Sequence, residues 1–141
     1  MMWARTDLGC QYKMFSYDKG ESWTTPEPAL EFKSEVSPLS MKRNPKNNAL
    51  VAIWSDRDAR WGLPAPTPNS WGRTPLVIAV SKDEGKTWKE ADILEADHKK
   101  GYCYTAMLFT NDNSLLLGYC IGGDKYAVLQ TIKMRKLKLK D

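Results

Sequence analysis

The sequence predicts an all-β protein made of repeated antiparallel sheets. The first observation is an eight-residue pattern, Ser-x-Asp-x-Gly-x-[Ser/Thr]-Trp, that occurs at 16–23 and again at 81–88. The second is that each copy follows a strand-like run, at 12–15 and at 76–80. The third is that short apolar or alternating runs recur between Gly, Pro, Asn and Asp, whereas helical periodicity is nearly absent. Together these features favour a meander of strands.

Each octet is predicted to form a tight hairpin turn. Its Ser and Asp, two residues apart, can accept hydrogen bonds from backbone N–H groups of the turn, and its Gly supplies the positive φ that other residues resist. The Trp, Trp23 in one copy and Trp88 in the other, is the first large apolar residue of the next strand. We expect both indoles to pack against neighbouring strands.

The strands are expected to group in fours. Residues 31–98 form one sheet and 99–141 another, whereas 1–30 supply the later strands of a sheet whose first strand is missing. These three units make up a single incomplete domain. The expected strands lie near 2–5, 11–16, 35–42, 49–54, 75–81, 92–95, 103–110, 114–120, 126–134 and 136–139.

The octets resemble the Asp-box, or BNR repeat, of sialidase-type (neuraminidase) β-propellers. Segments at 2–6, 37–43, 73–76 and 101–107 are also similar to that family, so the resemblance covers most of the chain. It implies a partial β-propeller of about three four-stranded antiparallel blades, from the C-terminal portion of a sialidase-like protein. Asp-boxes recur on propellers of unrelated function, so they indicate fold more than chemistry.

A chain of this length is too short to close a propeller by itself. Blades run about 40–50 residues, and a ring needs at least about four of them. Two interpretations follow from the resemblance. Either the chain is a truncation from the C-terminal half of a six-bladed protein, or two copies of about three blades assemble into one homo-oligomeric ring.

Composition excludes several classes of partner. The chain has 141 residues, 42% apolar and 27% charged, which is ordinary for a globular domain. We find no run of about 18 apolar residues and no signal peptide, so no membrane association is expected. The cellular location is not encoded in this chain, although the family it resembles is often secreted or periplasmic.

The C-terminal segment at 133–140 is the most basic part of a chain with net charge +4. It lacks the interleaved aromatic residues that stack on bases, so we expect no nucleic-acid partner. Its apolar residues alternate with lysine and arginine, which is typical of a half-buried strand whose charges discourage further pairing.

The three cysteines, Cys10, Cys103 and Cys120, show no metal-binding spacing, and no cofactor motif occurs. Buried free thiols are the expected state. Cys103 and Cys120 flank the turn at 111–113 almost symmetrically, so they are candidates for neighbouring strands. A cross-strand disulfide between them is the alternative.

The resemblance implies a site for a carboxylated sugar, such as a terminal sialic acid. Sialidases bind the sugar carboxylate with three arginines, whose planar guanidinium groups match it bidentately. Arg5 falls where the second of these arginines sits, and Arg73 falls where the third sits. Considered singly, Arg5 is also consistent with an exposed strand-end charge and Arg73 with an ordinary loop residue.

Tyr104 matches the nucleophilic tyrosine of the family, which replaces the carboxylate nucleophile of other retaining glycosidases. A neutral phenol avoids placing an anion beside an anionic substrate, and in the family a glutamate draws its proton. Tyr102 lies two residues away, so the register leaves both open, with a core aromatic as the competing interpretation. We expect Tyr104 to converge with Arg5 and Arg73 at one end of the blades.

The long loop at 55–72 carries a second group of candidates, Arg57, Arg60 and Trp61. Long loops on rigid scaffolds often carry function, and an indole beside charged groups suits sugar binding. A Pro-rich insertion that covers a blade edge is an equally good interpretation.

The resemblance also implies which parts of the family's site precede this chain. The first arginine, the acid/base aspartate and the activating glutamate all come before the strand that 2–5 resembles. The complete protein would perform retaining hydrolysis of a terminal sialic acid, whereas this chain alone is expected to be inactive. Whether it is an enzyme is therefore left open. The alternative is a non-catalytic Asp-box module that binds carbohydrate or serves as a structural repeat.

Overall fold

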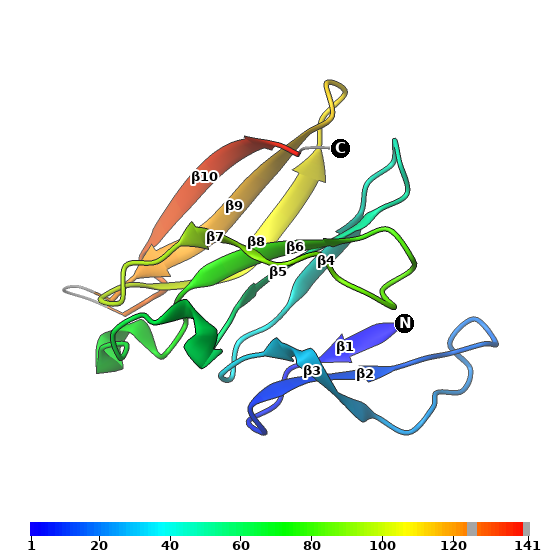
Figure 1. Ribbon diagram of the computed structural model, residues 1–141, viewed down its shortest axis with the longest axis horizontal. Coiled ribbons are helices and arrows are strands. Elements are labelled where there is room, and N and C mark those ends of the chain that lie inside the picture. The colour runs from blue at the N-terminus through cyan, green and yellow to red at the C-terminus, as the bar shows by residue number, and fades with distance from the viewer. Residues whose placement is uncertain (124–126, 140–141) are drawn as a thin grey trace.

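The described residues form three antiparallel β-sheets that follow one another along the chain. The computed structural model describes residues 1–123 and 127–139. Figure 1 shows the sheets side by side, with the middle one between the other two. The helices in these residues are two short 3-10 turns, η1 (Ala59–Trp61) and η2 (Pro68–Ser70). The prediction of an all-β fold is confirmed.

The first sheet contains β1 (Met2–Ala4), β2 (Cys10–Met14) and β3 (Glu27–Lys33), in that order. β3 was not among the expected strands, and it crosses the expected division at residue 30. Its signal is weak because Pro28 interrupts it, and proline is tolerated only at a sheet edge, where β3 lies.

The middle sheet contains four strands, β4 (Ser40–Arg43), β5 (Leu50–Ser55), β6 (Leu76–Ser81) and β7 (Asp92–Glu95). Every residue of β5 is buried, because the two other sheets cover this sheet on both faces. Strands that are buried on both faces have continuous apolar sequences, and the sequence of β5 is such a run.

The third sheet contains β8 (Gly101–Phe109), β9 (Ser114–Gly122) and β10 (Thr131–Lys138). The two strands expected at 126–134 and 136–139 are one strand, except that residue 126 lies outside the described residues. Pairing with β9 continues without a break from Thr131 to Lys138. This sheet therefore has three strands within the described residues, one fewer than expected.

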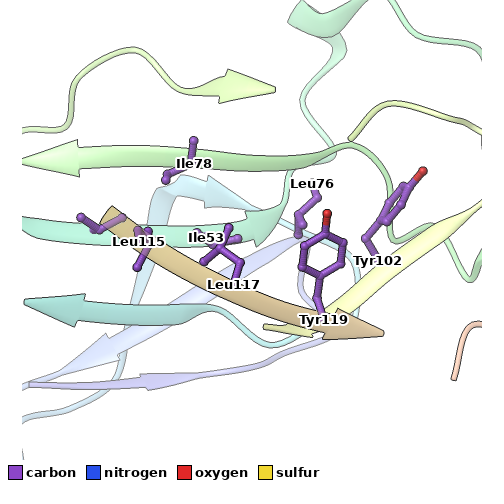
Figure 2. Packing of buried hydrophobic residues seen from close by; sticks show 8 residues of the cluster. Ile53, Leu76, Ile78, Tyr102, Leu115, Leu117 and Tyr119 are labelled. Atoms are coloured by element: carbon purple, nitrogen blue, oxygen red, sulfur yellow. The ribbon is translucent and has the colours of Figure 1, made fainter. Parts of the chain in front are cut away.

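An apolar core joins the middle and third sheets. Figure 2 shows aliphatic side chains of β5 and β6 facing those of β9, with Tyr102 and Tyr119 at one end. The two rings meet edge to face at 6.3 Å. The buried members of this core are Val51, Ile53, Leu76, Ile78, Tyr102, Leu115, Leu117 and Tyr119.

A second, aromatic core joins the first and middle sheets. Phe32 of β3 is fully buried at its centre. The indoles of Trp3, Trp54 and Trp88 meet the Phe32 ring edge to face, with ring centroids 5.0, 4.9 and 5.0 Å away. Edge-to-face pairs at this distance add to the stabilisation that burial gives. This cluster, called the Phe32 cluster below, holds the first sheet against the middle one.

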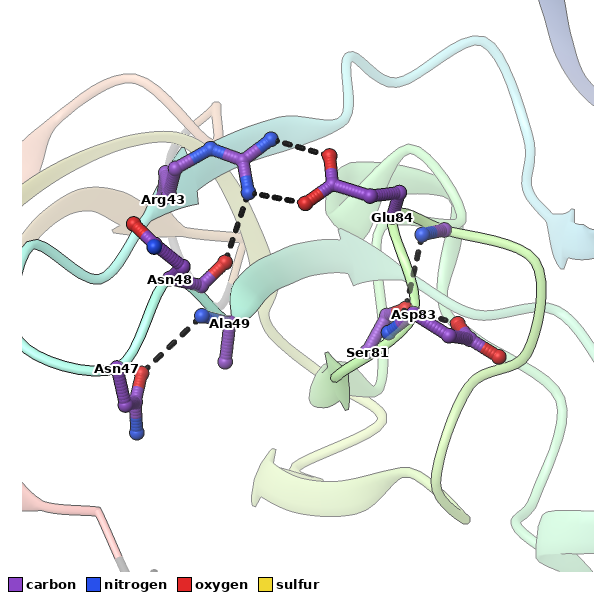
Figure 3. Close-up of polar contacts among 8 residues, drawn as sticks. Arg43, Asn47, Asn48, Ala49, Ser81, Asp83 and Glu84 are labelled. Atoms are coloured by element: carbon purple, nitrogen blue, oxygen red, sulfur yellow. Dashed lines mark hydrogen bonds and ion pairs between the residues drawn. The ribbon is translucent and has the colours of Figure 1, made fainter.

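Both octets form the predicted hairpin. The Oδ1 atom of Asp18 accepts the backbone N–H of Ser22 at 2.9 Å, and Asp83 accepts that of Thr87 at 2.9 Å. Both aspartates also accept the hydroxyl of that same residue, Ser22 or Thr87. Figure 3 shows part of the second hairpin together with the Arg43–Glu84 ion pair beside it.

The two tryptophans of the octets do not occupy equivalent packed positions, contrary to expectation. Trp88 is half-buried against Phe32, whereas Trp23 is 39% exposed. The indole N–H of Trp23 donates to the carbonyl of Gly20 at 3.2 Å within its own turn. Trp88 of the middle sheet has the first sheet beside it, whereas the described residues place no further sheet beside Trp23.

The described ranges contain neither a membrane-spanning helix nor a cluster of metal ligands. No helix there has the length and apolar character needed to cross a membrane. No three side chains of His, Cys, Asp or Glu gather there in a way that could hold a metal ion.

Candidate functional site

A β-bulge in β8 presents Tyr104 to solvent. The register with β9 shifts between Cys103 and Ala106, so one residue of β8 is left unpaired. Tyr104 adopts φ 55°, the left-handed region where such bulges usually carry glycine. Its side chain is 46% exposed, whereas that of Tyr102 is 1% exposed in the core. The bulge thus separates two tyrosines that strand register alone left open, and the exposed one is Tyr104, which the resemblance indicated.

Arg73 lies in the loop before β6 and is almost completely buried, at 6% exposure. Its Nη2 donates to the carbonyl of Val36 at 3.1 Å, whereas Nε and Nη1 are buried without an acceptor. The guanidinium lies between two aromatic rings, 5.1 Å from the centroid of Trp71 and 5.2 Å from that of Tyr104. Buried donors without a partner are rare, so each one requires an explanation.

Arg5 directly follows β1 and is exposed. The pKa of Tyr104 lies below its usual value, because first the Arg73 side chain and then that of Arg5 stabilise the phenolate. These interactions place both guanidinium groups close to the phenol. The structure therefore brings the three residues together, Arg5 from just after β1, Arg73 from the loop before β6 and Tyr104 from β8.

A buried chain of polar groups connects the three sheets. Gln11 Nε2 donates to Ser34 Oγ at 2.6 Å and to the carbonyl of Ser37 at 2.8 Å. The hydroxyls of Ser37 and Ser55 lie 3.3 Å apart, and Ser55 donates to the carbonyl of Tyr102 at 2.9 Å. All of these side chains are buried. Satisfied buried networks of this kind hold a backbone in one arrangement, here the strand that continues into Tyr104.

The backbone also connects Arg73 with β8. The N–H of Tyr102 donates to the carbonyl of Arg73 at 2.8 Å. The hydroxyl of Ser40 on β4 donates to the carbonyl of Thr105 at 2.7 Å, just beyond the bulge. These contacts could not be predicted, because serine and glutamine in apolar runs are not specific signals and the partners are far apart in the chain.

The loop candidates form a separate group around Asp56. Its carboxylate is buried and accepts Arg60 Nη2 at 2.7 Å and Trp61 Nε1 at 3.0 Å. Arg57 forms an ion pair with Glu35 at 3.4 Å. In the described part of the chain, no hydrogen bond, ion pair or ring contact joins Arg57, Arg60 or Trp61 to Arg5, Arg73 or Tyr104.

This loop lines a cavity of about 250 Å³. The Arg60 guanidinium lies over the Trp61 ring, 4.7 Å from its centroid. Asp56 therefore holds Arg60 and Trp61 within the loop, and Arg57 and Asp58 pair with Glu35 and Lys33 of the first sheet and its following segment, which suits a covering loop. The residues around the cavity are Asp56, Arg57, Asp58, Ala59, Trp61, Leu63, Pro64, Ala65, Pro66, Thr74 and Pro75.

Comparison with known proteins places the chain in a family. The model of the BNR repeat-like domain matches residues 1–118. The chain belongs to the BNR repeat-like family. No curated protein matches the sequence.

Solved structures are similar to this BNR repeat-like chain in fold. One is the leech intramolecular trans-sialidase in complex with 2,7-anhydro-Neu5Ac, with a TM-score of 0.69 and 16% sequence identity over 96% of the chain. Another is the Hadza microbial sialidase Hz136, with a TM-score of 0.45 and 18% identity over 84% of the chain and 28% of that structure. The chain spans 21% of the length of the leech protein. The first similarity supports the partial propeller.

Proposed function

We propose that this BNR repeat-like chain supplies two carboxylate-binding arginines, Arg5 and Arg73, and the nucleophile Tyr104 of a sialidase-type glycoside hydrolase. The observation that carries the proposal is the convergence of these residues, of which Arg5 follows β1, Arg73 precedes β6 and Tyr104 lies in β8. The family relationship and the similarity in fold support it. The substrate class is a glycan ending in sialic acid or another carboxylated sugar.

Arg73 is suited to bind the sugar carboxylate. Its Nε and Nη1 donors are buried and unpaired, and a carboxylate is the acceptor that such charged donors bind most strongly. The rings of Trp71 and Tyr104 fix the plane of this guanidinium. Arg5, which is exposed, would close over the anion from the first sheet.

Tyr104 would act as the nucleophile of a double displacement. Its phenol oxygen forms a bond to the anomeric carbon as the glycosidic bond breaks, and the departing oxygen takes a proton from a general acid. Water then cleaves the tyrosyl–sugar bond and returns the phenol. The lowered pKa of Tyr104 favours loss of its proton in the first step. None of the three assigned residues can protonate the departing oxygen or accept the proton of the phenol, so the complete reaction needs a general acid and a base, both carboxyl groups, from elsewhere.

Binding of a carboxylated sugar tests the first part of the proposal. We expect N-acetylneuraminic acid to shift the NMR signals of residues around Tyr104, whereas its methyl ester, which lacks the charge, shifts them much less. Arg73→Ala should weaken binding by about tenfold to a hundredfold, the loss of a charged hydrogen-bonded pair. Arg43→Ala, in the ion pair with Glu84, is the matched control. Equal binding of acid and ester would contradict the proposal.

Turnover separates catalysis from binding alone. The isolated chain should not hydrolyse an aryl sialoside, because the assigned residues include no general acid. In a complete protein that contains this segment, Tyr104→Phe should reduce kcat by several orders of magnitude, and Tyr17→Phe, at an 87% exposed position, should have no effect. Full activity of Tyr104→Phe would leave the alternative, a module that binds carbohydrate without catalysis.

We further propose that copies of the chain associate through the outer faces of the terminal sheets. Both faces expose large apolar side chains, Met2 and Leu30 on the first sheet and Leu108, Ile132 and Met134 on the third. Sedimentation velocity should show dimers or larger species, and Met134→Lys should reduce them more than Leu8→Lys, whose loop position is equally exposed. A monomer at high concentration would contradict association.

A further inference from the structure

Cys103 and Cys120 lie directly opposite each other on β8 and β9. All three cysteines of the chain are free, and the third, Cys10, lies on the first sheet. Because opposed residues of an antiparallel pair point to the same face, the thiols of Cys103 and Cys120 share one face of the third sheet. Their register pairing is the last before the β-bulge that presents Tyr104.

The backbone spacing of such a pair suits a disulfide. Opposed residues of antiparallel strands have Cα atoms about 4.5–5.5 Å apart, within the range of about 4.4–6.8 Å seen for disulfides. The pKa of Cys103 is raised, mainly by burial; the Arg73 guanidinium that faces the thiol opposes this in part, and a charge on Cys120 adds to the increase.

We propose that Cys103 and Cys120 form a reversible cross-strand disulfide that fixes the bulge presenting Tyr104. The bond would join β8 to β9 one residue before the bulge, at the point where the ladder register changes. It would restrict the two strands from separating there, and so hold Tyr104 in its left-handed conformation. The proposal concerns the backbone and does not depend on the proposed enzymatic role.

The exposure of the two thiols sets the order of events. Cys120 is half-buried and reachable, whereas Cys103 is 2% exposed. The Cys120 thiolate first attacks a small disulfide such as glutathione disulfide, which forms a mixed disulfide and releases one glutathione thiolate. The Cys103 thiolate then attacks the Cys120 sulfur and releases the second. Two protein thiols are oxidised, and one glutathione disulfide is reduced to two glutathione molecules.

The raised pKa of Cys103 predicts the pH dependence of crosslinking. Less Cys103 thiolate is present at neutral pH than for an exposed cysteine, so closure of the mixed disulfide is the slow step. The rate of crosslinking should therefore rise with pH through the alkaline range. Glutathionylated Cys120 should accumulate first and then decay.

The experiment uses the full folded chain with glutathione disulfide, followed by mass spectrometry. We expect loss of two hydrogens from the intact mass, reversal by dithiothreitol, and a crosslinked peptide after chymotrypsin, which cuts after Phe109 between the two cysteines. Cys103→Ser should stop the reaction at the mixed disulfide, and Cys10→Ser, the matched control, should not change it. A crosslink that includes Cys10, or none under native conditions, would overturn the proposal.

Two further measurements test whether the disulfide fixes the bulge. The oxidised chain should melt about 5–10 °C higher, the effect expected for a loop of this length in a domain of this size. Amide hydrogen exchange at 103–106 should slow more than exchange at 10–14 of the first sheet. A crosslink that forms without slowing exchange at the bulge would refute the fixing role.

Discussion

The two octet hairpins have the same internal bonds but different surroundings. In each, the Asp carboxylate accepts the backbone N–H and the hydroxyl four residues on, and the first Ser accepts the N–H of the Gly. The hairpin of the first sheet is largely exposed. That of the middle sheet has Ser81 buried and Trp88 packed against Phe32.

The difference shows what the motif specifies and what it leaves to its neighbours. The turn is complete within eight residues, so it forms in both settings. The indole is placed by whatever lies beyond the hairpin: Trp88 faces the Phe32 cluster, whereas Trp23 bonds to its own turn and remains 39% exposed. The octet therefore defines a hairpin, and the adjacent sheet decides whether its tryptophan contributes to a core.

Removing the ring that the middle hairpin packs against should have the largest effect. Phe32→Ala should destabilise the chain by about 3–5 kcal/mol, because a fully buried ring leaves a cavity among three indoles. Urea unfolding gives the free energy directly. Phe15→Ala, beside the exposed hairpin, should cost much less. Similar losses of unfolding free energy in both variants would show that the different surroundings of the two hairpins do not affect stability.

The tryptophans themselves provide a closer comparison. Trp88→Ala should cost about 2 kcal/mol and Trp23→Ala less than about 1 kcal/mol, in line with the apolar area that each buries. Both are measured by the same denaturant titration. If Trp23 proved the costlier of the two, an unrecognised partner would have to cover the first hairpin.

The fold was predictable where the strands have continuous apolar sequences. The runs that became β5 and β6 are continuously apolar because both of their faces are covered. β3 was missed because Pro28 and its charged neighbours hide a strand at a sheet edge. β10 was divided in two because Arg135 and Lys136 are adjacent, which interrupts the alternation that predicts a strand.

The candidate site was predictable only in part. The resemblance indicated Arg5, Arg73 and Tyr104, and the structure places them together, while their roles stay a prediction. The bulge could not be predicted, because nothing in a sequence signals a left-handed tyrosine. The two unpaired donors of Arg73 depend on burial by distant segments, which a local pattern does not contain.

Acid should weaken the hairpins by a smaller amount. The pKa of Asp83 is lowered to about 2, first by the Thr87 hydroxyl. Its contribution is present above the usual carboxyl pKa of about 4 and is lost as pH falls through about 2. Melting curves from pH 5 to pH 2 should show Asp83→Asn approaching the parent chain as pH falls. A constant difference would contradict this.

The left-handed Tyr104 also has an evolutionary consequence. Glycine would relax the backbone at this position, so Tyr104→Gly should leave stability unchanged or raise it by about 1 kcal/mol even though a large ring is lost. Selection for stability alone would therefore tend to remove the tyrosine. If Tyr104 has the proposed catalytic role, its presence in a strained position is what a trade-off between stability and activity would leave behind, and descendants without that activity would be expected to drift toward glycine here.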